Sequence, residues 1–330
     1  MTWRGSLAVA LLATLSRPRW WLLALAGFLV RGGILVVLLP IIAPPTVAGL
    51  MSFLAPTVIG EVISGGRGAP VAVVAIATAL VVTAFLSISG WLGTWFDAAL
   101  AGEAASSDEL GHDAAEPSGA SMPGPDRPSG LGTARLGPHV LTAIAFVFAA
   151  ARIFSVAYRE ATSPGAPTTP FVIRVFQGAP EAVIALVVAW VLAEAAGGLA
   201  LRDLLLPGAG GGAAGRPARR SIVRGIRDLA SPRGIATLLA VDLGVFVVVV
   251  PGWLATRHAW DQLRILLSGG AEVVDLAVGL GLFIGVAFGG VLLLAVALAW
   301  RSTAWTAMAV APDRHAAASQ GVGGVTLGPE

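Results

Sequence analysis

The chain alternates long apolar stretches with short polar segments, and this pattern predicts membrane-spanning helices. A spanning helix needs about 20 apolar residues, because each residue adds about 1.5 Å toward a hydrocarbon layer about 30 Å thick. Six stretches reach this length: 20–43, 71–96, 139–158, 181–201, 234–256 and 274–300. We therefore expect an all-α fold, a polytopic membrane helical bundle with six transmembrane helices.

Two further segments, 3–15 and 217–230, have the pattern of amphipathic interfacial helices. In the first, large apolar residues recur every four positions from Trp3 to Leu15. The sequence Ser-Arg-Pro-Arg at 16–19 follows, in place of the small-residue cleavage site of a signal peptide. We therefore expect a retained helix on the membrane surface.

The second interfacial segment contains ARRSIVRGIRDLA at 218–230, with apolar residues on one helical face and arginines on the other. This pattern predicts contacts to the headgroups of anionic phospholipids. The arginines expected to make them are Arg219, Arg220, Arg224 and Arg227. A basic loop that only fixes membrane topology would have the same composition. The segment has no aromatic residues for base stacking, so we expect no nucleic acid partner.

Changes in composition divide the chain into five regions. Residues 1–96 hold the first interfacial helix and two spans, and 138–203 hold a central transmembrane pair. Residues 97–137 are acidic and rich in Gly, Ala, Ser and Pro, which predicts a disordered cytoplasmic linker. Residues 204–311 comprise a Gly-rich linker, the basic interfacial helix and the last two spans, and 312–330 are predicted to be a disordered tail.

Composition supports a membrane location. Of 330 residues 56% are hydrophobic and 12% charged, with a mean hydropathy of +0.83, whereas soluble domains are about one quarter charged. All 21 basic residues are arginine, and Lys and Asn, whose codons are AT-rich, are both absent. We therefore expect a bacterial source. Most arginines lie in the two terminal segments and in the loops on the same side of the membrane as the termini. Because cytoplasmic loops are enriched in basic residues, we expect a multi-pass inner (plasma) membrane protein with both termini cytoplasmic.

The chain lacks the residue patterns of the common enzyme classes. Cysteine and lysine are absent, and the four histidines are scattered singly, none of them in the interior of a predicted span. Thiolate, serine–lysine and serine–histidine chemistry therefore have no candidates, and no metalloprotease spacing occurs. The only adjacent acids, Asp108 and Glu109, lie in the predicted linker. We expect no enzyme activity, no cofactor and no metal.

Four charged residues lie near the centres of predicted spans: Arg31, Arg152, Glu194 and Asp242. An isolated charge at the bilayer centre costs about 2.5–3.5 kcal/mol on insertion scales, so we expect these charges to face the bundle interior and pair. Small residues beside Arg31 and Glu194 would leave room for a guanidinium. We predict that Arg31 pairs with Asp242 and Arg152 with Glu194, or that all four form one network. Two interpretations stay open: the charges line a pathway, or they fix helix packing.

Similar sequence features in 3–96 and 217–305 suggest two parallel repeats that flank the central pair. Arg31 and Asp242 each lie nine residues before a proline, Pro40 or Pro251. The segments after these prolines, TVAGLMSFLAPTVIG and HAWDQLRILL, are predicted to lie on the outer membrane surface. Each repeat then has Ser-Gly-Gly, a span and a tryptophan pair.

Residues 3–305 resemble six-helix bacterial integral membrane proteins of unassigned function. The likeness rests on a surface helix before the first span and on Trp300-Arg301-Ser302-Thr303-Ala304-Trp305 after the last. It implies the architecture and supplies no functional residue.

The predicted function is that of a transporter or a membrane subunit of a transport complex. The alternative is a structural or lipid-organising membrane protein that recruits partners. The expected partners are the lipid bilayer, anionic phospholipids and a protein partner subunit.

Overall fold

A computed structural model describes residues 3–42, 69–107, 130–162, 171–206 and 217–322. These residues form helices and no strands, so the all-α prediction is confirmed for them. The elements are α1 (Trp3–Leu15), α2 (Pro18–Phe28), the π-helical turn η1 (Leu29–Gly33), α3 (Ile34–Leu38), α5 (Ala69–Ala105), α7 (Leu131–Leu136), the 3₁₀ turn η2 (Gly137–His139), α8 (Val140–Thr162), α9 (Phe171–Gln177), α10 (Pro180–Leu205), α11 (Ala218–Leu229), α12 (Pro232–Ser268) and α13 (Val273–Val322).

Five helical segments are long and apolar enough to cross a membrane. They are Pro18–Leu38, Leu131–Glu160, Pro180–Leu205, Pro232–Ser268 and Val273–Val310. Four of them contain a predicted span in full, and Pro18–Leu38 covers most of the span predicted at 20–43. The remaining predicted span, 71–96, lies inside α5, which is not among the five, so a total of exactly six spans stays a prediction.

The chain divides into two compact units. The larger unit comprises Met1–Ile41, Gly90–Pro138 and Glu194–Glu330, and the smaller comprises Ile42–Ser89 and His139–Ala193. Helices α5 and α10 contribute to both. The charged cluster described below belongs wholly to the larger unit.

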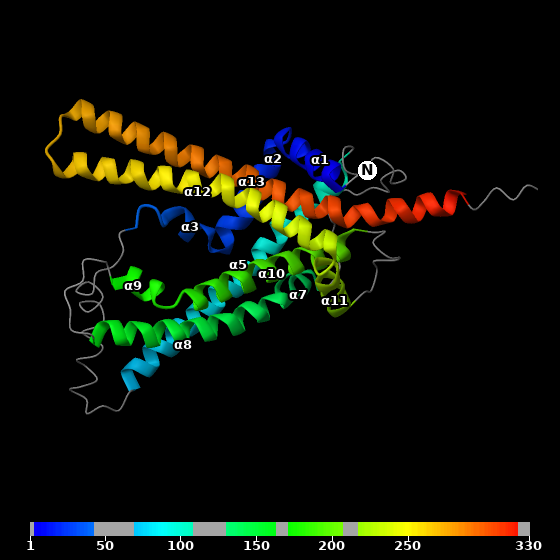
Figure 1. Cartoon of the computed structure of the whole chain (residues 1–330), viewed down its shortest axis with the longest axis horizontal. Helices are drawn as coiled ribbons and strands as arrows, with labels where there is room; N and C mark the ends of the chain where they lie inside the picture. The colour runs from blue at the N-terminus through cyan, green and yellow to red at the C-terminus, as the bar shows by residue number, and fades with distance from the viewer. Residues whose placement is uncertain (1–2, 43–68, 108–129, 163–170, 207–216, 323–330) are drawn as a thin grey trace, which may run out of the picture. The chain divides into compact units, whose positions relative to one another are not determined.

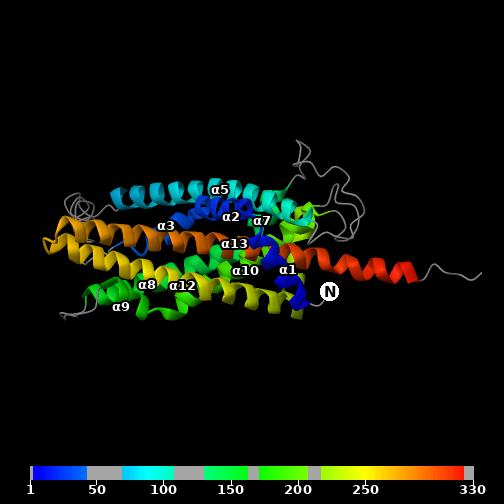
Figure 2. The same ribbon diagram turned by 90° about the horizontal axis from the view of Figure 1, so that it is seen from above.

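Helices α12 and α13 of the larger unit lie side by side and antiparallel (Figures 1 and 2). Helix α12 begins after Ser231, whose hydroxyl accepts a hydrogen bond from the Gly234 amide at 3.0 Å, with Pro232 in the first turn. It continues through Pro251 to Ser268. The segment HAWDQLRILL, predicted to lie on the outer membrane surface, prolongs α12 without a break. Its counterpart after Pro40 lies outside the described residues.

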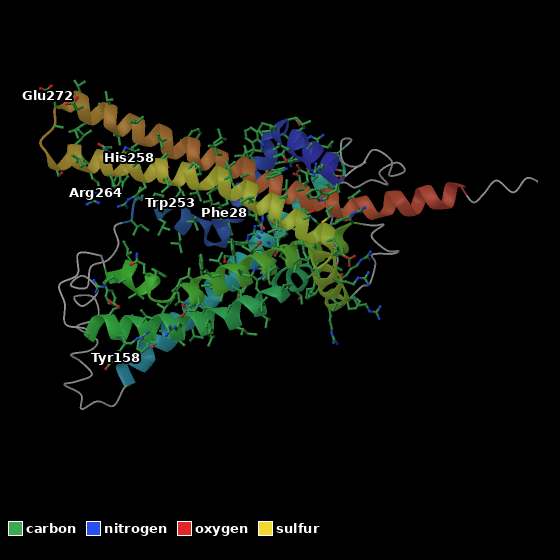
Figure 3. All side chains as sticks on the ribbon, in the orientation of Figure 1. Phe28, Tyr158, Trp253, His258, Arg264 and Glu272 are labelled. Carbon is green, nitrogen blue, oxygen red and sulfur yellow. The ribbon has the colours of Figure 1, made fainter. Side chains whose placement is uncertain are left out.

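The C-terminal half of α12 and its connection to α13 carry polar and aromatic side chains. Trp253, His258 and Arg264 lie along this half of α12, and Glu272 lies in the connection to α13 (Figure 3). Arg257 donates a hydrogen bond to the carbonyl of Pro40 at 2.9 Å and pairs with Asp261 at 3.0 Å. Such mixed aromatic and charged ends are typical of helices that reach a membrane–water boundary.

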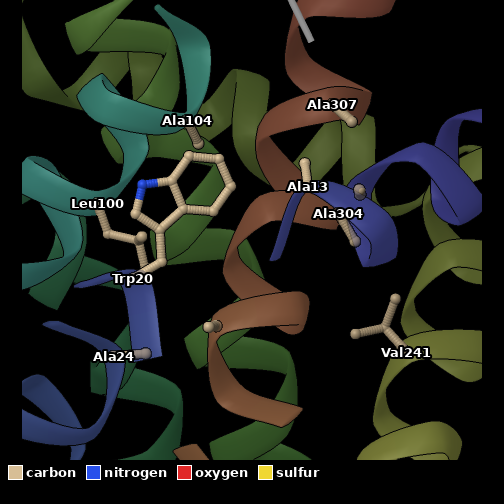
Figure 4. Packing of buried hydrophobic residues seen from close by; sticks show 10 residues of the cluster. Ala13, Trp20, Ala24, Leu100, Ala104, Val241, Ala304 and Ala307 are labelled. Carbon is tan, nitrogen blue, oxygen red and sulfur yellow. The ribbon is translucent and has the colours of Figure 1, made fainter. Parts of the chain in front are cut away.

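Small residues let the opposite end of the larger unit pack closely. Trp20 of α2 is buried against Leu100 and Ala104 of α5, and alanines fill the contacts between α1 and α13 (Figure 4). The hydroxyls of Thr14 and Thr303 meet at 2.8 Å in the same region. Helix α1 is thus held by buried packing with α13, and its position on the membrane surface stays a prediction.

Two segments predicted to be disordered are helical where the structure describes them. In the predicted linker 97–137, α5 continues to Ala105, and α7 forms at 131–136. Buried Leu100, Ala101 and Ala104 stabilise the first of these helices. Their packing offsets the entropy cost of ordering the chain, which the composition of the segment does not reveal. The predicted tail begins inside α13, which continues to Val322. Residues 108–129 and 323–330 lie outside the described residues.

Candidate functional site: a buried cluster of arginines and carboxylates

Four charged side chains from four segments of the larger unit form one network. Arg31 Nη1 lies 2.8 Å from Asp97 Oδ2 and 3.6 Å from Glu194 Oε2. Arg135 Nε lies 2.9 Å from Asp97 Oδ2, and Arg135 Nη2 also contacts Glu194 Oε2. Each arginine therefore bridges both carboxylates, and each carboxylate bridges both arginines.

The network is shielded from its surroundings. The side chains of Arg135 and Glu194 are 4% and 8% exposed, against 16% for Asp97 and 22% for Arg31. Charge-assisted hydrogen bonds in such a low-dielectric setting are short and strong, and removal of one partner leaves an uncompensated charge. The four side chains are thus strongly dependent on one another.

A local distortion of the first span presents Arg31 to the network. The π-turn η1 replaces regular helix at Leu29–Gly33, with Gly32 at φ 93°, a region that favours glycine. Arg31 Nε donates to the Gly27 carbonyl at 3.1 Å, so the side chain also satisfies a backbone acceptor at this irregular turn. The Arg-Gly-Gly sequence therefore supplies both the cation and the kink.

Glycines on neighbouring helices make room for the two arginines. A Cβ on Gly93 would lie 2.4 Å from Arg31 Cγ, and one on Gly197 would lie 2.2 Å from the Arg135 carbonyl oxygen. Real Cβ atoms do not approach so closely, so both positions need glycine. The predicted role of small residues after Glu194 is thus supported, although the guanidinium nearest Gly197 is that of Arg135 and not that of Arg152.

A third arginine, Arg202 of α10, is 3% exposed and bonds only neutral groups. It donates to the Thr306 hydroxyl at 2.9 Å and to the Gly198 carbonyl at 2.8 Å. It also donates to the carbonyl and hydroxyl of Ser302, at 2.8 and 2.7 Å. Among the described residues no carboxylate forms an ion pair with this guanidinium.

A fourth arginine, Arg301 of α13, pairs with Asp242 of α12. Arg301 Nε lies 2.8 Å from Asp242 Oδ1, and this is the only hydrogen bond that the described residues give to Arg301. The other carboxylate oxygen of Asp242 is buried without a hydrogen-bond partner in the described part of the chain. The pair is therefore joined through one atom of each group.

A cavity of about 50 Å³ lies among these groups. Its charged and hydroxyl lining comprises Arg31, Asp97, Arg135, Glu194, Arg202, Arg301 and Ser302. Apolar side chains, including Phe28, Leu100 and Trp305, complete the walls. A polar recess of this kind among long apolar helices is the main candidate for a binding site.

The predicted charge pairs are wrong. Asp242 pairs with Arg301 and not with Arg31, and Arg152 pairs with Glu181 at 2.6 Å and not with Glu194. The single network of all four residues is wrong as well, since only Arg31 and Glu194 come together. The side chains of Arg152 and Glu181, in the smaller unit, are 40% and 49% exposed, which sets them apart from the buried cluster.

The network also lies at a different level of the helices from the one predicted. Asp97 immediately follows the apolar stretch 71–96, and Arg135 precedes 139–158. Since Arg31 and Glu194 contact these two residues, the cluster is level with the ends of those apolar stretches and not with their centres.

Sequence reasoning missed four residues of the cluster: Asp97, Arg135, Arg202 and Arg301. Each lies beside a predicted span, where a charge is ordinarily solvated and serves topology. One signal was available for Arg202. It follows Glu194 by eight residues, with Gly198 midway, so the three share one face of α10.

The four arginines of the second predicted site, on α11, have different surroundings in the structure. Arg219, Arg220 and Arg227 are exposed. Arg224 instead pairs with buried Asp203 of α10 at 3.1 Å, so it is engaged within the protein. Gly225 brings α11 close to α10, since a Cβ there would lie 2.8 Å from the Ala196 carbonyl oxygen. The prediction that α11 is a helix is confirmed, and headgroup binding stays a prediction.

The carboxyl of Asp228, also on α11, has a perturbed pKa. Partial burial raises the pKa of Asp228, and Asp203 adds to this, whereas Arg224 and Arg227 oppose it. Asp228 is thus the group whose titration reports on the docking of α11.

No known protein family, characterised protein or solved structure matches this chain. The described residues also contain no group of three or more His, Cys, Asp or Glu side chains that could hold a metal ion. The buried cluster and its cavity are therefore the features of the described residues that bear most on function.

Proposed function

We propose that this protein is a transporter, or the membrane subunit of a transport complex, in a bacterial inner membrane with both termini cytoplasmic. The observation that carries the proposal is the cavity lined by four arginines within a unit that contains long apolar helices, Pro18–Leu38, Pro232–Ser268 and Val273–Val310. Buried charges in membrane proteins commonly mark the path of an ion or polar solute. We assign the cavity as the solute-binding site.

The contacts give each side chain a role in this proposal. Asp97 and Glu194 hold the guanidinium groups of Arg31 and Arg135 in place. Ser302 and Thr306 of α13 hold Arg202 through their hydroxyls. The site therefore joins segments that are far apart in the sequence, and a shift of any one helix would alter it.

Solute flux into proteoliposomes tests this proposal. The purified chain is reconstituted, and stopped-flow light scattering follows the entry of small anionic, cationic and neutral solutes. We expect protein-dependent flux of at least one class that Arg31→Gln abolishes. The matched control, Arg152→Gln, removes an arginine from an exposed pair and retains the flux. Vesicles no more permeable than protein-free ones, with the folded protein recovered from them, would contradict a self-contained transporter.

Co-purification from native membranes tests the subunit form of the proposal. Recovery with a fixed partner such as an ATPase, identified by mass spectrometry in mild detergent, would support it. Recovery without a partner, together with an absence of flux, would contradict both forms.

A second candidate function, lipid organisation, is favoured by the exposed face of α11. Val223 and Ile226 are 60% and 51% exposed and lie beside exposed Arg219 and Arg227. Apolar side chains flanked by arginines suit the headgroup region of an anionic bilayer. Vesicle flotation of an α11 peptide, with and without phosphatidylglycerol, tests this. Equal binding to both vesicle types would contradict it.

A further inference from the structure

The charges of the cavity do not cancel. Asp97 and Glu194 offset Arg31 and Arg135, and Asp242 offsets Arg301. Arg202 remains, a buried cation whose hydrogen bonds all go to neutral oxygens. The group as a whole therefore carries one excess positive charge. A buried charge without a counter-charge is costly, so the site favours an anion that would compensate it.

Arg301 supplies unused hydrogen-bond donors at the same cavity. A guanidinium has five N–H donors, and the described residues accept from Arg301 only at Nε. The cavity is lined by this residue, and its side chain is 17% exposed. Both terminal nitrogens of Arg301 are thus available to a ligand. Arg31 and Arg135, by contrast, are occupied by Asp97 and Glu194.

The volume limits what the cavity can hold. A water needs roughly 10–15 Å³ of probe-occupied space, so a cavity of about 50 Å³ has room for about four water-sized volumes. A halide, a short carboxylate or one phosphodiester group has this size. A large organic solute does not, unless the walls move.

We propose that the cavity binds one singly charged anion, held by the terminal nitrogens of Arg301 and compensating the charge of Arg202. This inference rests on the proposed function in taking the same cavity as the solute site, and it names the substrate class. The anionic group comes either from a free anion in solution or from the phosphodiester of a lipid headgroup.

The test measures binding in detergent, where no transport takes place. Purified protein in a neutral detergent is titrated with sodium formate or sodium chloride against sodium gluconate at constant ionic strength, and the Tm is recorded. We expect a saturable rise in Tm with a small anion and none with gluconate, since ligands that bind the folded state raise Tm by mass action.

Two substitutions give opposite shifts in affinity. Arg301→Gln removes the donors and should weaken anion binding about tenfold or more. Asp242→Asn keeps the donors and adds an uncompensated charge, so it should tighten binding. Arg152→Gln, in the smaller unit, should leave the affinity unchanged. Native mass spectrometry of the same samples shows whether bound phosphatidylglycerol is present and lost in Arg301→Gln, which distinguishes the lipid source from the free anion.

Equal Tm responses to formate, chloride and gluconate, with no lipid lost in folded Arg301→Gln, would overturn the inference. A saturable response that Arg301→Gln retains would overturn it too. Anion binding without flux in proteoliposomes would keep this inference and contradict a self-contained transporter. Flux of cations alone, with no anion binding, would support a transporter and overturn this inference.

Discussion

Arg135 and Glu194 are the most deeply buried members of the charge network, and Arg135 could not be recognised from its sequence context. It lies in LGTARLGP, a Gly-containing segment at the edge of a span, where a charge usually faces water. Its burial depends on Gly197 of a helix about 60 residues away. Local sequence patterns hold no information about such a contact, whereas the placement of Glu194 in an apolar span marked it at once.

Removal of the Glu194 charge tests the importance of burial. Glu194→Gln leaves Arg135 with one fewer carboxylate, and we expect it to lower the free energy of unfolding by about 3–5 kcal/mol. The control, Glu181→Gln, breaks the exposed pair with Arg152 and should lower the free energy of unfolding far less, because solvent screens this pair. Denaturant unfolding in detergent, followed by circular dichroism, measures both. Equal losses would show that burial of the first pair does not matter.

At the level of elements, the length of the apolar stretches predicted the presence of helices well but the positions of their ends poorly. Helices α5, α12 and α13 all continue beyond the apolar stretches that identified them. Packing explains part of this for α5, where Leu100 and Ala104 are buried beyond the apolar stretch. Hydropathy indicates whether a helix lies in lipid or water, and not which helices pack against it. The length of a helix that extends beyond its apolar stretch but stays packed is therefore underestimated.

Close helix contact at α10 gives a prediction at the same scale. Gly197→Ala would place a Cβ against the backbone of Arg135, and we expect a loss of about 1–3 kcal/mol or more in the free energy of unfolding. Gly281→Ala in α13 meets no atom within 4 Å and should be neutral or stabilising by up to about 1 kcal/mol. Thermal unfolding of the two variants in one detergent checks this. An unaffected Gly197→Ala protein would show that α7 and α10 are not in this contact.

The raised pKa of Asp228 predicts how the stability of α11 depends on pH. Burial makes the folded state hold the Asp228 proton more tightly than the unfolded state does. Stability therefore rises as pH falls from neutral through the raised pKa, and the gain is complete below the usual carboxyl range. Asp228→Asn should remove this part of the pH dependence. Hydrogen exchange of α11 amides between pH 4 and pH 7 measures it, and an identical pH profile in the variant would contradict the assignment.

For the whole molecule, the sequence was sufficient for the all-α class, five apolar helices, the helix at 3–15 and the amphipathic helix α11. It was not sufficient for the charge partners, nor for α1, which is apolar around its circumference and not amphipathic. Partner choice depends on how segments far apart in sequence are brought together. The proposed duplication is not tested, yet one relation agrees with it. Arg31 pairs with Asp97, beside the tryptophans of one segment, and Asp242 pairs with Arg301, beside those of the other. The two pairs have opposite polarity.

The measurement that tests the account most directly is a pair of double-mutant cycles on Arg31. One cycle combines Arg31→Gln with Asp97→Asn, and the other combines Arg31→Gln with Asp242→Asn, with the free energy of unfolding as the readout. Residues in one ion-pair network couple by about 0.5–3 kcal/mol, whereas independent sites add within about 0.5 kcal/mol. We predict coupling of Arg31 to Asp97 and none to Asp242. Coupling to Asp242 alone would contradict the charge cluster described here.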